Sequence, residues 1–113
     1  MAAFPSRGEV WLAGMPDGFG REQKGDRPVV VMATAERFGV VCAVPLTSSP
    51  LASGFPNALK IAKTKENGLS VDSVALAFQI TAFSELRFLR KMGELSEVDF
   101  KAVKAEAKIY LGL

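Results

Sequence analysis

The stretch Pro28-Val29-Val30-Val31-Met32-Ala33, followed by Gly39-Val40-Val41-Cys42-Ala43-Val44, decides the fold of this chain. Both runs are uncharged and rich in valine, whose branched side chain packs well on a pleated surface. The residues between them, Glu36 to Gly39, end in glycine, as many turns do. We therefore expect the two runs to pair as an antiparallel central hairpin.

Weaker β-rich runs lie on both sides of the hairpin. Residues 9–14 form the first run, and Met15 to Asp26 follows as an exposed loop rich in Gly, Pro and charge. Pro45 is expected to end the second central strand, because proline cannot donate to a sheet ladder, and to begin an irregular stretch that reaches Pro56. Further short strands are expected at 57–61, 73–79 and 89–95.

Only the last quarter of the chain has the periodicity of a helix. Ser96 is a candidate N-cap with Asp99 three residues later, and apolar residues recur on one face at Phe100, Val103, Ala107, Tyr110 and Leu111. We predict a helix over 97–111. Short strands with one terminal helix predict a mainly β (α+β) fold, a small bent barrel with the helix packed on it.

Length and composition exclude several classes of protein. With 113 residues the chain is expected to form one domain, 1–113, too small for a two-domain cofactor enzyme. It has no histidine, which removes Ser-His and Cys-His nucleophilic pairs and histidine zinc sites. Cys42, the single cysteine, sits in an apolar run and is expected to be buried. We expect no metal, no cofactor and no intrachain disulfide.

Charge and hydropathy indicate where the protein acts and with what. Adding the 10 glycines to the hydrophobic 49% and removing the one Tyr gives about 57% apolar residues, above the usual range of about 45–50%. This excess indicates an interface with a second copy. Net charge is only +2, so an anionic partner must meet a local patch. Neither a signal peptide nor a membrane span is expected, and a reducing cytoplasm fits.

A candidate site lies where the two central strands end. Antiparallel pairing puts Arg27 and the cluster Thr47-Ser48-Ser49 at the same end of the hairpin, and Glu22 lies in the preceding loop. A guanidinium holds a phosphate through two parallel hydrogen bonds, and hydroxyls add uncharged donors. The set suits a phosphodiester. The residues alone also allow a solvated Arg27, an ordinary polar loop and a Glu22 that pairs with Arg21 or Lys24.

Aromatic residues are the candidates for stacking on bases. Trp11 and Phe78 sit inside strand-like runs, which favours a place in the core. Phe19 and Phe55 fall in loops, where a ring stays accessible to a base.

The order of short motifs along the chain closely resembles the MazF/PemK family of toxin endoribonucleases. Those motifs are Arg7-Gly8-Glu9-Val10-Trp11-Leu12, Gly20-Arg21-Glu22-Gln23, Gly25-Asp26-Arg27-Pro28-Val29-Val30-Val31, Val44-Pro45-Leu46-Thr47-Ser48, Asp72-Ser73-Val74-Ala75 and Gln79-Ile80. The resemblance covers nearly the whole chain from Arg7. It implies an SH3-like barrel shared with CcdB gyrase poisons, a homodimer, an antitoxin partner and metal-independent cleavage of single-stranded RNA.

The resemblance also implies roles for individual residues. Arg27 and Thr47 match functional residues of the family, and Glu22 is the candidate base that activates the ribose 2′-hydroxyl. The attack leaves a 2′,3′-cyclic phosphate and a 5′-hydroxyl, with Arg27 stabilising the charge on phosphorus. Arg27 is also a candidate proton donor to the leaving oxygen. The expected RNA-binding residues are Arg21, Lys24, Phe19, Ser48 and Gln79. An acidic antitoxin segment that folds on binding is expected to block the groove.

Some positions depart from one well-studied branch of that family. Arg21 stands where the branch has His, Leu76 and Phe78 stand where it has Arg and Asp, and Thr81 stands where many relatives have Arg. Two alternatives therefore accompany the nuclease: a CcdB-like gyrase poison that acts by protein binding, and a degenerate member that binds RNA or antitoxin without cutting.

Overall fold

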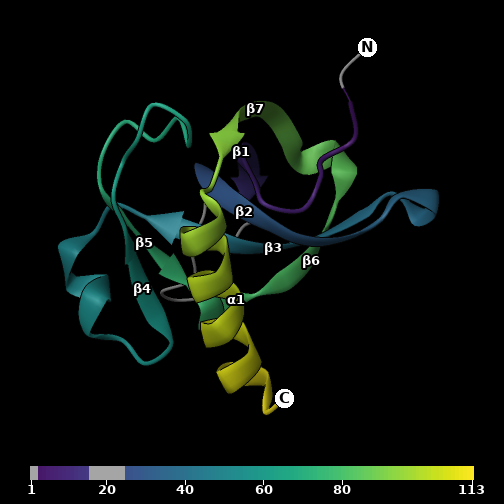
Figure 1. Cartoon of the computed structure of the whole chain (residues 1–113). Helices are drawn as coiled ribbons and strands as arrows, with labels where there is room; N and C mark the ends of the chain where they lie inside the picture. Colours follow the sequence, from purple (N-terminus) through teal and green to yellow (C-terminus); the bar gives the residue numbers. More distant parts are fainter. Residues whose placement is uncertain (1–2, 16–24) are drawn as a thin grey trace.

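The computed structural model describes residues 3–15 and 25–113 and shows a bent antiparallel sheet with one helix packed against it (Figure 1). Single-turn 3-10 helices interrupt the chain between several strands. The strands and helix are β1 (Glu9–Met15), β2 (Gly25–Ala35), β3 (Val40–Thr47), β4 (Ala58–Ile61), β5 (Ser73–Leu76), β6 (Thr81–Ser84), β7 (Phe88–Glu94) and α1 (Glu97–Leu111).

The predicted central hairpin is confirmed, and both of its strands are longer than expected. β2 and β3 pair antiparallel, with Val30 opposite Val44 and Val31 opposite Ala43. The turn between them is a 3-10 helix at Glu36–Phe38, and Gly39 follows with φ 67°, a left-handed conformation that glycine adopts without strain.

The expectation that β3 ends at Pro45 is wrong. Pro45 is still paired with Val29 of β2, and the next residue, Leu46, pairs with Ala75 of β5. On passing Pro45, β3 therefore loses its pairing with β2 on one edge and gains β5 on the other. Proline is tolerated at this position because the ladder with β2 ends there and the ladder with β5 begins at the next residue. Few strand-pairing hydrogen bonds are therefore lost through its missing N–H.

The flanking strands match the expected runs with shifted ends. The expected run at 9–14 corresponds to β1, the run at 57–61 to β4, and the run at 89–95 to β7. The strand expected at 73–79 ends at Leu76, and Ala77–Gln79 forms a 3-10 turn instead. β6 was not predicted. Phe83 is its one buried side chain, so its sequence carries almost no alternation of apolar and polar residues.

The predicted helix 97–111 is confirmed. Ser96 caps it, because its Oγ accepts a hydrogen bond from the backbone N–H of Asp99 at 3.1 Å. Val103 and Ala107 are buried against the sheet. Tyr110 and Leu111 were expected on the same buried face, but they are about half exposed. The reason is visible in Figure 1, where the last turn of α1 extends beyond the strands.

The predicted barrel is an open sheet rather than a closed one. Its strands run in the order β4-β5-β3-β2-β1-β7, with β6 beside the first half of β3, and within residues 3–15 and 25–113 no pairing joins β4 to β7. Alternate residues of β2 and β3 feed two apolar clusters. One includes Val30, Val44 and Val103 of α1, and the other includes Trp11 and Val31.

Three further expectations concern single residues. Trp11 is in the core, as predicted. Phe78 is only partly buried and packs edge-on against Phe55, with ring centroids 5.9 Å apart. Cys42 is partly buried rather than enclosed, and burial raises the pKa of its thiol. Among the described residues, no helix is long and apolar enough to cross a membrane.

Candidate functional site

Arg27 lies near the start of β2, opposite Ala13 of β1. Its guanidinium crosses toward β3, and Nη1 donates a long hydrogen bond of 3.5 Å to the carbonyl oxygen of Leu46. Its Nε is buried and, among residues 3–15 and 25–113, has no hydrogen-bond partner. Burial lowers the pKa of Arg27, yet a guanidinium stays charged at neutral pH. This arginine is a partly desolvated cation with donor capacity left over.

A cavity of about 220 Å³ opens beside Arg27, and we call it the arginine cavity. The start of β2, the end of β3 and the loop that precedes β5 supply its walls. Arg27 and Asp26 are its charged lining residues, and the rest of the lining is neutral. The lining residues are Asp26, Arg27, Pro28, Leu46, Ser48, Leu69, Ser70, Val71 and Ser73.

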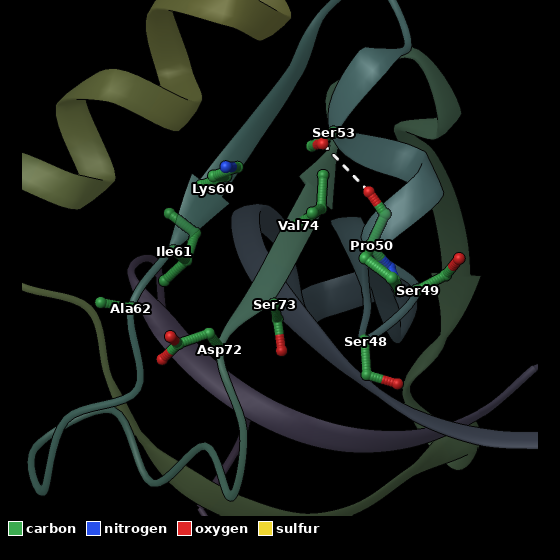
Figure 2. A pocket seen from close by; sticks show the side chains of 10 residues that line it. All are labelled: Ser48, Ser49, Pro50, Ser53, Lys60, Ile61, Ala62, Asp72, Ser73 and Val74. Atoms are coloured by element: carbon green, nitrogen blue, oxygen red, sulfur yellow. Dashed lines mark hydrogen bonds between the residues drawn. The ribbon is translucent and has the colours of Figure 1, made fainter.

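A second cavity of about 410 Å³ adjoins the first, since Ser48 and Ser73 line both. Figure 2 shows its side chains, among which serine hydroxyls predominate. We call it the serine cavity. Its charged residues are Lys60 and Asp72. The two cavities together form a hydroxyl-lined surface with one cation and one carboxylate in each, Arg27 with Asp26 and Lys60 with Asp72, so phosphates of a polar chain would meet the hydroxyls and the two cations.

Thr47 is the last residue of β3. It is 7% exposed, pairs with Val74, and its Oγ1 accepts a hydrogen bond from the backbone N–H of Ser49 at 3.2 Å. The Thr47 hydroxyl therefore shapes the turn that presents Ser48. The cavity linings include Ser48 but not Thr47.

Comparison with known proteins gives the family. The model of PemK-like, MazF-like toxins of type II toxin–antitoxin systems matches residues 6–111. The chain belongs to this family. A curated relative, Endoribonuclease MazF of Staphylococcus saprophyticus, is 34% identical over 110 residues, which are 95% of this chain and 91% of the relative.

Two solved structures have the same fold. MazF of Deinococcus radiodurans superposes with a TM-score of 0.82 at 23% identity and covers 99% of this chain and 100% of its own. An endoribonuclease from a mycobacterial species, solved with its cognate antitoxin, gives a TM-score of 0.73 at 20% identity, with 96% of each chain covered.

The remaining predicted site residues of this PemK/MazF-family chain are less closely placed. Gln79 ends the 3-10 turn after β5, whereas Ser73 begins that strand, so Gln79 is separated from the arginine cavity by the length of β5. It lines neither cavity. Four predicted residues, Glu22, Arg21, Lys24 and Phe19, lie outside the described residues.

Among the cavity residues to which the sequence had given no role are Lys60, Asp72 and Ser73. Asp72 and Ser73 belong to one of the family-like motifs. The sequence did not predict that β5 pairs with the end of β3. In that pairing Val74 lies opposite Thr47, so Ser73, the residue before Val74, comes close to the end of β3. The signal that could have identified Ser73 is its position at the start of a predicted strand, if that strand had been paired with the one that ends at the Thr47-Ser48-Ser49 cluster.

The structure shows what occupies the positions at which this chain departs from the well-studied branch of the family. Leu76 is fully buried and packs with Ala52 and Val74, and Phe78 packs against this small cluster. Thr81 is exposed on β6, opposite Ala43. This chain therefore uses for packing two positions at which that branch has charged side chains. Across residues 3–15 and 25–113, no three His, Cys, Asp or Glu side chains gather as a metal site.

Proposed function

We propose that this toxin is an endoribonuclease that cuts single-stranded RNA at short sequence motifs, without a metal, by attack of the ribose 2′-hydroxyl on the adjacent phosphorus. The observation that carries the proposal is the Arg27 guanidinium in the wall of a cavity that Ser48 also lines, with Nη1 making a long bond of 3.5 Å to the Leu46 carbonyl. Membership of the PemK/MazF family and a relative named as an endoribonuclease support it.

Arg27 binds the scissile phosphate and stabilises the transition state. Its fork of N–H groups matches two phosphate oxygens, and within the part of the chain that the structure describes one long hydrogen bond, to Leu46, competes for them. Charge on the nonbridging oxygens grows as the 2′-oxygen attacks, so a fixed cation that is partly withdrawn from water gains strength in the transition state. The nearby carboxylate of Asp26 limits nonspecific anion binding.

Hydroxyl groups position the same phosphate. Ser48 lines the arginine cavity and is the donor nearest in sequence to the Leu46 carbonyl that Arg27 contacts. Thr47 acts through the turn, since its hydroxyl holds the Ser49 amide. Neither residue brings a charge, so the site needs no additional counterion when RNA leaves.

Proton transfer falls to Glu22 and Arg27. Glu22 takes the proton of the 2′-hydroxyl, the 2′-oxygen forms a bond to phosphorus, and the P–O5′ bond breaks. The products are a 2′,3′-cyclic phosphate and a 5′-oxygen that takes up a proton as it leaves. Burial lowers the pKa of Arg27, the direction that favours donation of that proton.

The serine cavity extends the RNA site, and further contacts come from Arg21, Lys24, Phe19 and Gln79. Lys60 supplies a cation at a phosphate next to the scissile one. We propose that the protein works in the cytoplasm as a homodimer. Exposed apolar residues at the end of α1 support a second copy: Ile109, Leu111 and Leu113.

An antitoxin is the proposed regulator. MazE–MazF complexes of Deinococcus radiodurans share this fold, one of them with a TM-score of 0.74 at 24% identity and 99% of both chains covered. An acidic antitoxin segment laid over Arg27 and Lys60 would compete with RNA phosphates for the same cations.

The test is cleavage of a long RNA by the purified protein in EDTA, followed by mapping of the ends. We expect discrete cuts that carry cyclic phosphate, and their loss in Arg27→Ala while the fold persists. Binding without cleavage would favour the degenerate family member. Intact, unbound RNA together with trapped gyrase–DNA complexes would favour a CcdB-like poison.

A further inference from the structure

We propose that Asn67 is a positioning residue for RNA cleavage: it locks the loop of residues 62–72, whose far half forms a wall of the arginine cavity. The proposal rests on the proposed function, since it assigns Asn67 a part in the same site. Asn67 lines neither cavity. Its effect therefore passes through the loop.

The Asn67 side chain holds the loop together from inside. It is 1% exposed. Its Oδ1 accepts hydrogen bonds from the backbone N–H groups of Thr64 and Leu69, both at 3.0 Å, and its Nδ2 donates to the carbonyl oxygen of Ala62 at 2.9 Å. Thr64 Oγ1 in turn accepts from the Asn67 backbone N–H at 3.0 Å. A single buried amide thus joins the start, the tip and the far half of the loop.

The locked loop is seated directly on β7. Gly68 has φ 70°, and a Cβ there would overlap the carbonyl oxygen of Met92. A Cβ on Gly93 would likewise overlap the carbonyl oxygen of Glu66. The backbone N–H of Glu94 donates to that same oxygen at 2.8 Å. Because backbone meets backbone here, with no room for a side chain between them, the loop keeps one position relative to the sheet.

The far half of this loop shapes the surroundings of Arg27. Leu69, Ser70 and Val71, which come after Asn67 and Gly68, line the arginine cavity. Leu69 also packs into the apolar cluster that contains Leu46, whose carbonyl receives the Arg27 bond. Leu69 is buried and Val71 is half exposed, and with Ser70 they form one side of the cavity that Arg27 lines, so a fixed loop limits the water that screens the guanidinium from a phosphate. If the loop moves, water reaches the guanidinium and the preorganised site is lost.

The kinetic experiment compares Asn67→Ala with a substitution that weakens the fold elsewhere. Val41→Ala is the matched control, since Val41 is fully buried in the cluster around Trp11 and lines neither cavity. Well below the unfolding temperature of each variant, Asn67→Ala should lower kcat about tenfold to a hundredfold with a smaller change in KM. Val41→Ala should keep the wild-type kcat. Asn67→Asp, which keeps both acceptor bonds and loses the donor to Ala62, should fall between, and it decides the test if Asn67→Ala does not fold.

A second readout does not depend on activity. Proton exchange of the Arg27 Nε–H, measured by NMR and assigned with Arg27→Lys, should be slow in the wild type, faster in Asn67→Ala and unchanged in Val41→Ala. Absence of cleavage by the wild type would overturn the proposed function, while the exchange rates would still test the wall. The positioning role of Asn67 is overturned if Asn67→Ala shows the kcat and exchange rate of Val41→Ala.

Discussion

Arg27 on β2 and Leu46 on β3 meet where the central hairpin comes apart, with Nη1 of the arginine 3.5 Å from the leucine carbonyl oxygen. Leu46 is the first residue of β3 that pairs with β5. Beyond Pro45 the two strands have no further pairing with each other, so a gap opens between them. The arginine cavity thus lies where the pairing of β2 with β3 ends.

Replacing Arg27 tests the cation. Arg27→Ala should slow RNA cleavage about a hundredfold or more, because transition-state charge loses its fixed partner. Arg27→Lys should recover part of the rate, since it keeps the charge but not the two-point grip. Initial rates on a fluorescent RNA measure both. Arg37→Ala, at the far turn, removes an equal charge and should cleave as the wild type does; equal losses for the two arginines would contradict the assignment.

The hydroxyls of Thr47 and Ser48 have different roles, so removing each should impair the site in a different way. Ser48→Ala removes a donor from the cavity, whereas Thr47→Val removes the acceptor for the Ser49 amide and so displaces the turn. We expect losses of roughly tenfold or more for each, and near-normal rates for Thr47→Ser, which keeps the acceptor. Thr34→Val, at the exposed far end of β2, is the control. Full activity of both Thr47→Val and Ser48→Ala would remove the hydroxyls from the mechanism.

Glu9 should make stability depend on pH in the acid range. Burial acts to raise the pKa of its carboxyl, but hydrogen bonds from the Trp11 indole, the Ser6 amide and Lys91 together lower it below the ordinary 4.5. The folded protein therefore binds this proton less tightly than the unfolded chain. The stabilisation is complete above that ordinary value and lost as pH falls through the lowered pKa.

Urea unfolding from neutral pH down to acid measures this dependence. Glu9→Gln should flatten the acid side of the stability curve, whereas the exposed Glu36→Gln should leave its shape unchanged. A Glu9→Gln curve parallel to the wild type at every pH would show that Glu9 contributes nothing to it.

The helix cap offers a test of the fold that should leave catalysis alone. Ser96→Ala removes the acceptor for the Asp99 amide and should cost about 1 kcal/mol of stability, or a drop of about 4 °C or more in Tm. Ser96→Asp should restore most of it. Calorimetry and cleavage rates at 25 °C measure the two properties, and a fall in kcat for Ser96→Ala would connect α1 to the active site against expectation.

Two glycine substitutions should differ sharply. Gly93→Ala forces a methyl group onto the Glu66 carbonyl, whereas Gly54→Ala meets nothing within 4 Å. We expect a severe loss of stability, above about 2 kcal/mol, for the first, and almost none for the second. Thermal unfolding of both variants checks this. Equal Tm values would mean that the loop and β7 separate easily.

Much of the fold could be predicted because local signals agreed with it. The valine runs paired as a hairpin, and Ser96 capped the helix over the expected range. The misses arose where tertiary contacts outweigh local preference. Pro45 ends one ladder rather than the strand, and β6 is held by its pairing with β3 despite a nearly patternless sequence.

The candidate site was partly predictable for a similar reason. Arg27 and Ser48 line one cavity because antiparallel pairing fixes which strand ends meet. Ser73 and the wall held by Asn67 come from a loop and strand distant in sequence, and no local pattern connects them to Arg27. Gln79 was placed by motif order, yet it follows the end of β5 away from Ser73.

The most direct measurement is the structure of the protein with an RNA that carries a 2′-deoxyribose at the mapped cleavage position and therefore cannot be cut. The account predicts the scissile phosphate within hydrogen-bond distance of the Arg27 guanidinium, with Ser48 beside it. An RNA bound elsewhere on the molecule, with its scissile phosphate away from a vacant arginine cavity, would contradict the account.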